Sequence, residues 1–266
     1  VLAVLHPLER VRATLPRVGE AARGLRGWGD TAAVPAPANP PGPPAVAEAR
    51  EKGDVTREEA ENLLGFCNNS GPAFIIGAAG VGVFGSSGAG LLLYFSHVTA
   101  AVMTGALLSR RGAVSNAPPR ADARALGLAS ALPAAVKKSV VAVLNVCGFV
   151  VIFCILVGLL DAQGGFSLLT GVIAARTGLE LHYVRSLLTG LLELGSGIGA
   201  MQGLALTPLN LSLASFLLGW GGVSVHFQTM AVLAGTDVKG VRHLAGRLLS
   251  GCISAAVTLL LGGLLI

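Results

Sequence analysis

Four long stretches of this chain contain no Asp, Glu, Lys or Arg, and they constrain the fold more than any other feature. They cover residues 62–109, 139–160, 194–236 and 248–266, and are 48, 22, 43 and 19 residues long. A helix needs roughly 20 apolar residues to cross a bilayer. Only 12% of the residues are charged, against about 25% in a typical soluble domain. The sequence therefore predicts an all-α, polytopic membrane protein embedded in a lipid bilayer.

The basic residues gather in short connections between the apolar stretches. One connection holds Arg110, Arg111, Arg120, Arg124, Lys137 and Lys138, and another holds Lys239, Arg242 and Arg247. An excess of Lys and Arg marks cytoplasmic loops, so both connections are predicted on the cytoplasmic side. The first 60 residues contain eight basic and eight acidic side chains. The net charge of +5 therefore gives no sign of nucleic-acid binding.

The N-terminal region differs in composition from the rest of the chain. Residues 34–44 (VPAPANPPGPP) hold six prolines, a composition that is incompatible with a regular helix. We expect residues 1–44 to be poorly ordered, or to be a remnant of missing N-terminal spans. Residues 45–266 are expected to form one transmembrane domain.

Glycine and polar residues break the apolar stretches into pieces, several of them too short to cross a bilayer. Thr56 and Glu59 predict a capping box for a helix that ends at Gly65. Breaks are expected at 67–72 (CNNSGP), 85–90, 195–199 and 221–222, with half-helices at 73–84, 184–194 and 223–234 and full spans at 91–109, 139–160 and 241–266. Broken helices of this kind surround the binding sites of secondary transporters.

A weak internal repeat relates two of these breaks. The motif LLGF at 63–66 recurs as LLGW at 217–220, and each copy is followed by small and polar residues and then by a half-helix ending in Ala-Gly. Interrupted segments in corresponding positions of two halves indicate a transporter's binding site. Chance similarity in a chain rich in Leu and Gly is the alternative.

The first candidate substrate-binding segment is the turn formed by Asn68, Asn69, Ser70 and Gly71. Pro72 suits the first turn of the following helix and Ser70 suits its cap. The free N–H groups of that turn would then favour a carboxylate. An ordinary interhelical turn at the membrane surface is the alternative.

The second candidate segment contains Gly222, Ser224, His226 and Gln228. Spacings of two do not place the three polar side chains on one face of a regular helix, but an extended start to the segment would let them converge. Polar side chains inside membranes usually face a cavity or a partner. Hydrogen bonding between helices is the alternative interpretation.

Glu193 is the third candidate, because it is the only formal charge between Ser186 and Thr236. A carboxylate deep in apolar sequence is a functional hypothesis by default, and it would bind a coupling cation or take up a proton. An ion pair with Arg185 or Arg176 near the interface is the alternative.

The remaining polar residues of the apolar stretches receive structural interpretations. His97 is expected to be a satisfied packing or hydrogen-bonding histidine. The four cysteines show no metal-ligand spacing and are expected to be small buried hydrophobes. The sequence contains no catalytic constellation, so we expect neither an enzyme nor a cofactor beyond a coupling cation or proton.

Three segments resemble the YlbJ (SpoVV) family of sporulation integral membrane proteins. They are TREEAENLLGFCNNSGPAFIIGAAGVGVFGSS (56–87), LLTGLLELGSGI (187–198) and SFLLGWGGVSVHFQTMAVL (215–233), in the family's order across about residues 45–266. The resemblance implies a nucleoside-recognition or Gate domain, like half of a concentrative nucleoside transporter, with an inverted repeat of re-entrant hairpins. Family members have further spans before CNNSGP, which indicates that this chain is a fragment or that its gene model is damaged.

The same resemblance implies a function. The family's role is to move dipicolinate, a small anionic aromatic solute, across the outer forespore membrane during endospore formation. Two half-helix N-termini, after Asn69 and after Gly222, would each face one carboxylate of the dianion. A non-transporting scaffold or regulator of spore maturation and a transporter of a nucleoside-like solute remain as alternatives, and assembly as a homo-oligomer stays open.

Overall fold

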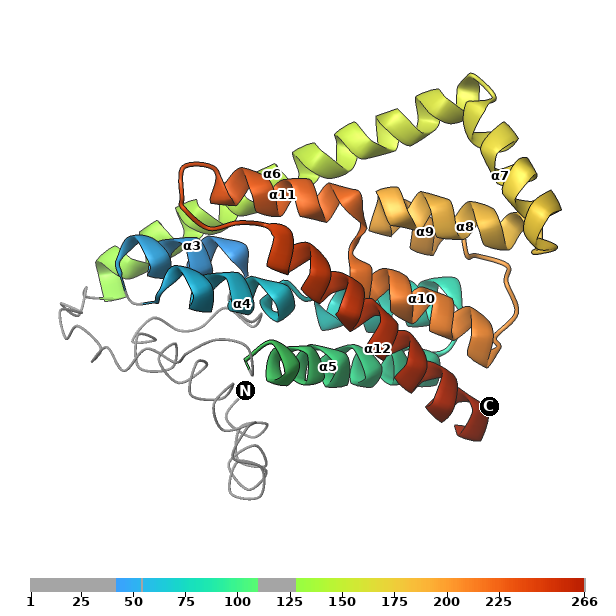
Figure 1. Cartoon of the computed structure of the whole chain (residues 1–266), viewed down its shortest axis with the longest axis horizontal. Coiled ribbons are helices and arrows are strands. Elements are labelled where there is room, and N and C mark those ends of the chain that lie inside the picture. The colour runs from blue at the N-terminus through green and yellow to red at the C-terminus, as the bar shows by residue number, and fades with distance from the viewer. Residues whose placement is uncertain (1–41, 54, 110–127, 266) are drawn as a thin grey trace. The chain divides into compact units, whose positions relative to one another are not determined.

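The structure, a computed structural model, describes residues 42–53, 55–109 and 128–265, and this described part is helical with no strand (Figure 1). Four helical segments in it are long and apolar enough to cross a membrane: Ser87–Leu108, Ser139–Ala162, Pro208–Leu233 and Val241–Leu264. The predicted all-α polytopic membrane fold is confirmed. Of the predicted N-terminal segment 1–44, only the last three residues are described.

The chain divides into two compact units, each built from three separate parts of the sequence. Among the described residues, unit 1 contains 42–53, 55–69, 102–109, 128–142 and 232–246, and unit 2 contains 70–101, 143–231 and 247–265. Three long helices contribute residues to both units: α5 (Ser87–Ser109), α6 (Leu128–Ala162) and α12 (Val241–Leu265).

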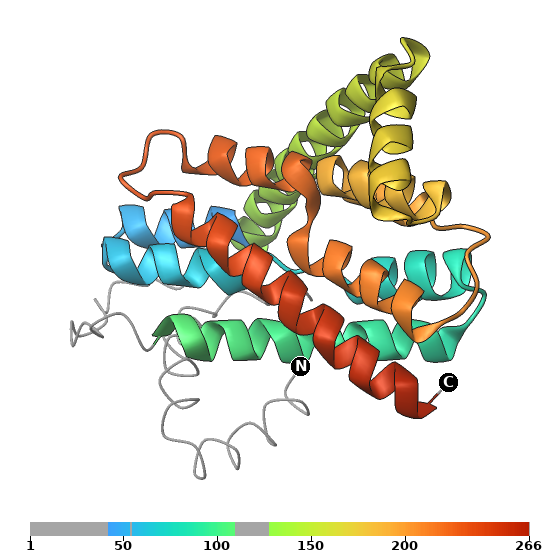
Figure 2. The same cartoon turned by 45° about the vertical axis from the view of Figure 1, so that its right-hand side comes forward.

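Unit 1 is built around two short helices that lie side by side, α3 (Pro43–Glu51) and α4 (Arg57–Cys67) (Figures 1 and 2). Helix α3 starts with two prolines, which need no amide partner in the first turn. Helix α4 has the predicted capping box, in which the Thr56 hydroxyl accepts from the Glu59 amide and the Glu59 carboxylate accepts from the Thr56 amide. It continues to Cys67, two residues beyond the predicted end.

The core of unit 1 joins α3 and α4 to the connection before α12. Buried apolar side chains meet there, namely Val46, Ala47, Ala60, Leu64, Cys67, Leu233 and Val238. Gly65 lets α12 approach α4 closely, because a Cβ placed on Gly246 would lie 2.4 Å from the Gly65 Cα atom. The ring of Phe66 packs against Gly105 of α5 in the same unit.

Unit 2 contains the broken helices. Its short elements are the π-helix η1 (Ala73–Val83), α7 (Gly165–Thr177), α8 (Leu181–Leu192), α9 (Leu194–Gly199), α10 (Pro208–Trp220) and α11 (Gly222–Leu233). The core holds apolar side chains of η1, α5, α9 and α10, including Ile75, Leu93, Ile198, Leu211 and Leu217. The predicted half-helices 73–84 and 223–234 are confirmed to within one residue at each end.

Two helical hairpins in the described part of unit 2 close through glycine. Between η1 and α5, a Cβ on Gly80 would lie 2.3 Å from the Gly90 Cα atom. Between α8 and α9, a Cβ on Gly197 would lie 2.0 Å from the Gly190 Cα atom. Real Cβ atoms do not approach carbon so closely, so only glycine fits these crossings.

These hairpins correct two predicted breaks. The first hairpin resumes as helix at Ser87, so residues 87–90 begin α5 instead of breaking the chain. In the second, Gly195, Gly197 and Gly199 do not end a helix but form α9. The chain breaks before them, at Glu193, whose backbone is extended with φ −140° and ψ 118°.

Helices α10 and α12 run antiparallel in unit 2 and lie next to each other in both views (Figures 1 and 2). Small residues let their backbones meet, since a Cβ on Gly219 would lie 2.4 Å from the Gly251 Cα atom. The Ser215 hydroxyl bonds those of Ser254 and Thr258. Small residues and hydroxyl bonds are the usual contacts between helices in lipid.

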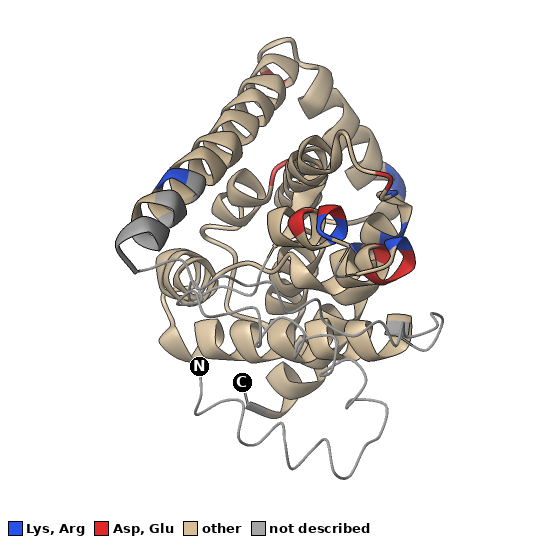
Figure 3. Cartoon of the chain, turned by 90° about the vertical axis from the view of Figure 1, so that its left-hand side faces the viewer, with Lys and Arg blue, Asp and Glu red and all other residues tan. Residues whose placement is uncertain are grey.

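The span in α6 has an apolar surface that the rest of the molecule leaves uncovered. Only 6% of the most apolar part of the span Ser139–Ala162 is buried. Figure 3 shows that this stretch carries almost no charge. Leu144, Ile152 and Ile155 are among its exposed side chains. A surface of this composition suits hydrocarbon, so the chain is an integral membrane protein.

Candidate functional site: a broken-helix junction with a buried arginine

The break between α10 and α11 depends on two successive glycines. Gly221 and Gly222 have φ values of +88° and +83°, a region that side chains strongly disfavour. A Cβ on Gly222 would lie 3.0 Å from the Leu194 amide nitrogen and 3.2 Å from the Leu192 carbonyl oxygen. The predicted break at 221–222 is confirmed, and it lies directly against the break at Glu193.

The Trp220 side chain ties these two breaks together. Its indole N–H donates to the Leu191 carbonyl at 3.1 Å, an oxygen in the last turn of α8 that lacks a helical partner. The same ring meets the His226 ring edge to face, with centroids 4.3 Å apart. The end of α8, the start of α9 and the α10–α11 connection therefore form one junction in unit 2.

Glu193 caps a helix inside this junction. Its side chain is 3% exposed, and its two carboxylate oxygens accept from the Gly195 and Ser196 amides. The predicted burial is confirmed, and the alternative of an ion pair with Arg185 is not found, because Arg185 donates instead to Asp161 at 2.6 Å. Cys154 adds a polar neighbour, with its sulfur 3.4 Å from the Ser196 hydroxyl.

The polar residues after Gly222 lie on a regular helix. Because α11 begins at Gly222, the extended start that would have let Ser224, His226 and Gln228 converge is absent. Ser224 and Gln228 are four residues apart and share one face, whereas His226 contacts Trp220. The Ser224 side chain is fully buried, and within the described part of the chain its hydroxyl has no hydrogen-bond partner.

The turn at 68–71 is stabilised by contacts within the chain segment itself. The Asn69 side-chain amide donates to the Phe66 carbonyl at 2.7 Å and so caps the end of α4. The Gly71 carbonyl accepts from the Phe74 and Ile75 amides, so Gly71 and not Ser70 supplies the cap of the next helix. Asn68 and Asn69 belong to unit 1, whereas Ser70 and Gly71 belong to unit 2.

Arg247 is a functional candidate that the sequence analysis missed. It was placed in a basic loop, but it lies within α12 and is 1% exposed. Its Nη2 atom donates to the Leu218 carbonyl at 3.1 Å and lies 3.6 Å from the position of a Gly221 Cβ. A buried cation is therefore held at the end of α10, beside the start of α11. The sequence contains one indication of this burial, because the last span is expected to begin at residue 241, six residues before Arg247.

The contacts of α12 support the predicted repeat. In unit 1, His243 bonds the carbonyl of Leu64, the second leucine of LLGF, at 2.9 Å. In unit 2, Arg247 bonds the carbonyl of Leu218, the second leucine of LLGW. The next residue in each motif is the glycine that touches α12, Gly65 at Gly246 and Gly219 at Gly251. In both motifs, therefore, the second leucine's carbonyl bonds a side chain of α12 and the following glycine touches the backbone of α12.

Further buried polar side chains of unit 2 come from α5 and α12. Ser96, His97 and Ser250 are each at most 1% exposed, and their hydroxyls or ring nitrogens have no hydrogen-bond partner among the residues that the structure describes. Of the two structural roles expected for His97, packing is therefore observed and hydrogen bonding is not. His97 follows by one turn of α5 the buried Leu93, which shares a core with Leu217 and Leu218 of α10.

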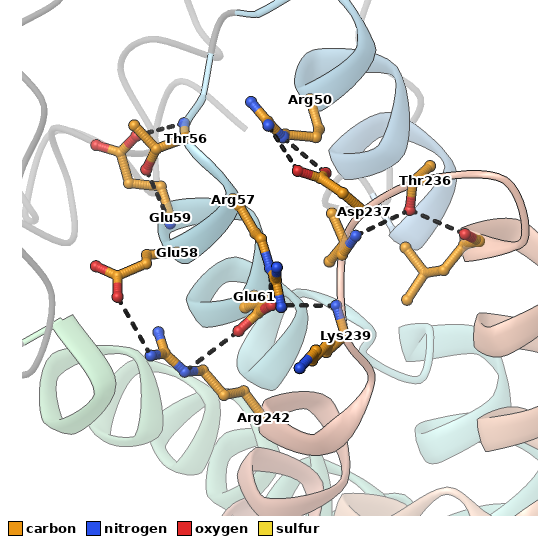
Figure 4. Close-up of polar contacts among 12 residues, drawn as sticks. Arg50, Thr56, Arg57, Glu58, Glu59, Glu61, Thr236, Asp237, Lys239 and Arg242 are labelled. Atoms are coloured by element: carbon orange, nitrogen blue, oxygen red, sulfur yellow. Dashed lines mark hydrogen bonds and ion pairs between the residues drawn. The ribbon is translucent and has the colours of Figure 1, made fainter.

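Unit 1 holds a charged cluster at the start of α4, drawn in Figure 4. Glu61, 7% exposed, accepts from the Arg57 side chain at 2.9 Å and from the Lys239 amide at 3.1 Å, and Arg242 lies 3.5 Å away. Burial opposes ionisation of Glu61, but these donors and the charges of Arg57 and Arg242 together lower its pKa.

Arg50 and Asp237 complete the cluster. The Arg50 guanidinium donates to both carboxylate oxygens of Asp237, at 2.9 and 2.7 Å. These hydrogen bonds lower the pKa of Asp237. The cluster fastens the connection between α11 and α12 to α3 and α4, and it gives the predicted basic connection at Lys239 and Arg242 a structural role.

Among the described residues, no group of three or more His, Cys, Asp or Glu side chains could hold a metal ion. The described cysteines are all free, and Cys67 alone among them is buried, whereas Cys147, Cys154 and Cys252 are exposed. The expectation that all four are buried is wrong for these three.

Comparison with known proteins gives one curated relative. The chain is 29% identical over 253 residues to the sporulation integral membrane protein YlbJ of Bacillus subtilis (strain 168). The match covers 84% of this chain and 60% of that protein, so the chain spans about three fifths of the relative's length. No family model and no solved structure matches the chain. The match confirms the predicted relationship to the YlbJ family.

Proposed function

We propose that this chain, which is similar to the sporulation integral membrane protein YlbJ, carries dipicolinate, pyridine-2,6-dicarboxylate, across the outer forespore membrane during endospore formation. The substrate and the membrane follow from the family resemblance described above. The residues of unit 2 supply the physical support.

The observation that supports transport is the packing of two helix breaks against each other inside apolar sequence. Gly222 leaves no room for a side chain between the α10–α11 break and the backbone of Leu192 and Leu194. Irregular backbone is tolerated at membrane depth where it is buried in protein or lines a cavity. Transporters use such discontinuous helices to present amides and carbonyls to solute and coupling ion. A scaffold has no need for this arrangement.

Glu193 is the proposed coupling residue at this junction. Its carboxylate is the acceptor for two amides of α9, so protonation would weaken the cap that starts that helix. Taking up a proton or a cation at Glu193 would therefore change the α8–α9 break, which contacts Gly222. Binding of the proton or coupling cation at Glu193 would in this way affect the α10–α11 break.

The proposal is tested by uptake of dipicolinate into vesicles that contain the purified full-length protein. Isophthalate and a nucleoside serve as competing solutes, and Asn69→Ala and Glu193→Gln serve as variants. Asn210→Ala is the matched control for Asn69→Ala, because Asn210 also bonds a backbone carbonyl at a helix end, that of Ala205, but at no break between half-helices.

Selective uptake of dipicolinate that Asn69→Ala weakens and Asn210→Ala does not would support the proposal. Loss of the dependence on a pH gradient in Glu193→Gln would identify the coupling residue. Uptake of the nucleoside in place of dipicolinate would favour the nucleoside-like solute. No uptake of any solute by folded protein would favour a scaffold or regulator of spore maturation.

A further inference from the structure

We propose that the second break binds a carboxylate group of the transported solute through Arg247, with Ser224, Ser250 and His97 as its polar neighbours. This proposal rests on the transport function proposed above and names the part of unit 2 that would recognise the anion. Asn68 and Asn69 are not needed for it.

The first argument is the position of the charge. The guanidinium of Arg247 is 1% exposed inside a candidate membrane span, where a cation is costly and usually functional. The Leu218 carbonyl holds one of its nitrogens beside Gly221. A guanidinium offers a planar fork of N–H donors that matches the two oxygens of a carboxylate.

The second argument is the direction of α11. This helix of 12 residues begins at Gly222, one residue after the glycine beside Arg247. The first amides of a helix lack helical partners, and their dipoles favour a negative charge. Arg247 and the start of α11 therefore bring two sources of positive potential to the same break.

The third argument is the set of buried polar atoms without partners. The hydroxyls of Ser224 and Ser250 and both ring nitrogens of His97 make no hydrogen bond, although each side chain is at most 1% exposed. Buried polar groups in native proteins are almost always hydrogen-bonded. A bound solute with oxygen acceptors would supply partners.

These side chains lie around the same break. Ser224 is in the first turn of α11, and Ser250 follows Arg247 by one turn of α12, where its carbonyl carbon would lie 3.0 Å from a Gly219 Cβ. His97 follows by one turn of α5 the buried Leu93, which packs in the same core as Leu217 and Leu218 at the end of α10. Three helices, α5, α11 and α12, thus contribute side chains to one region that would bind an anion.

The experiment measures binding of dipicolinate, picolinate and nicotinamide to the purified full-length protein in detergent. Picolinate keeps one carboxylate, and nicotinamide has none. The variants are Arg247→Gln, Ser224→Ala and Ser250→Ala. Arg242→Gln is the matched control, since Arg242 lies on the same helix but pairs with Glu61 and Asn62 in unit 1.

We expect Arg247→Gln to weaken binding of both carboxylates roughly tenfold or more, the loss typical of one charge-assisted hydrogen bond. Ser224→Ala and Ser250→Ala should weaken it about threefold, and Arg242→Gln should leave it unchanged. If all three variants bind dipicolinate as tightly as the wild-type protein, the proposed site is wrong. The transport proposal would not be affected by that result.

The remaining outcomes separate the site from the function. Binding of picolinate that depends on Arg247, without binding of dipicolinate, would support the site and refute the proposed substrate. Binding of neither carboxylate would overturn both. If Arg247→Gln does not fold, the two serine variants decide, because removal of an unpartnered hydroxyl leaves the packing intact.

Discussion

Glu193 shows how one side chain can serve the fold and the proposed transport at the same time. Its carboxylate starts α9 by accepting two amides, in a place where the chain has just left α8. A helix cap contributes about 1 kcal/mol, and a buried amide left without a partner costs about 1–3 kcal/mol. The break therefore depends on the acceptor oxygens as well as on the charge.

We predict that Glu193→Ala lowers the stability of the protein by about 2 kcal/mol, because both amides lose their acceptor. Glu193→Gln should cost less, since its amide oxygen still accepts one bond. Thermal unfolding in detergent measures both. Equal stability of Glu193→Ala and the unmodified protein would show that the cap is dispensable.

For single residues, the sequence can indicate that a position has a functional role, but it does not predict which atoms that residue contacts. Glu193 stands out because it is the only charge in its stretch, but its acceptor role depends on an extended backbone that no pattern announces. Arg247 is missed for the opposite reason, because three basic residues close together resemble a loop. Only the packing of α12 on Leu218 shows that Arg247 is inside the protein.

Glycine decides where the helices of unit 2 meet. Gly80 with Gly90, Gly190 with Gly197, and Gly219 with Gly251 each bring two backbones together. From the sequence, Gly90 and Gly197 are predicted to lie in breaks, since glycine is unfavourable inside helices. In a membrane, close packing of helices outweighs that preference, and for this reason α9 is helical although half of its residues are glycine.

The crossing of α10 and α12 gives a prediction at this scale. Gly219→Ala should destabilise the protein by about 1–3 kcal/mol, because the new methyl group would overlap the Gly251 backbone. Gly263→Ala on α12 is the control, since nothing lies within 4 Å of its Cβ position. Unfolding of both variants in detergent compares them. If Gly219→Ala were as stable as the wild-type protein, α10 and α12 could move apart without loss of stability.

The charged cluster of unit 1 predicts a sensitivity to acid. Glu61 and Asp237 have lowered pKa values in the folded protein, so their stabilisation is complete above the pKa of an unfolded carboxyl, about 4. It is lost as the pH falls through the lowered values. Thermal stability should therefore decrease steadily below about pH 4.

Glu61→Gln tests the source of this acid sensitivity. The variant should be less stable at neutral pH, because the ion pairs with Arg57 and Arg242 are gone, and it should lose less stability on acidification. Melting temperatures from pH 7 to pH 3 in detergent show both effects. An identical acid profile in the variant would place the sensitivity in other carboxylates.

For the whole molecule, the sequence predicts the class, three of the four candidate spans and the breaks at 68–71 and 221–222. These features follow from charge, hydropathy and turn chemistry, which act over a few residues. The junction of the Glu193 and Gly222 segments joins residues about 30 positions apart, so no local pattern contains it.

The orientation in the membrane remains a prediction of the positive-inside rule. In a variant without the four cysteines, Lys239→Cys should react with an impermeant thiol reagent from the cytoplasmic side. Gln163→Cys should react from the opposite side, because the span Ser139–Ala162 separates it from the basic residues before that span. Labelling of both positions from the same side would contradict the predicted topology.

The two LLG motifs and their contacts with α12 have a consequence for the ancestry of the molecule. If the motifs descend from one duplicated segment, each copy inherited a glycine and a carbonyl that needs a donor. The donors, His243 and Arg247, stand one turn apart on a single helix, so they were not copied with the segments. The lineage had to evolve the second donor on α12 independently, and this explains why the two copies ended with different chemistry, an imidazole for one and a guanidinium for the other.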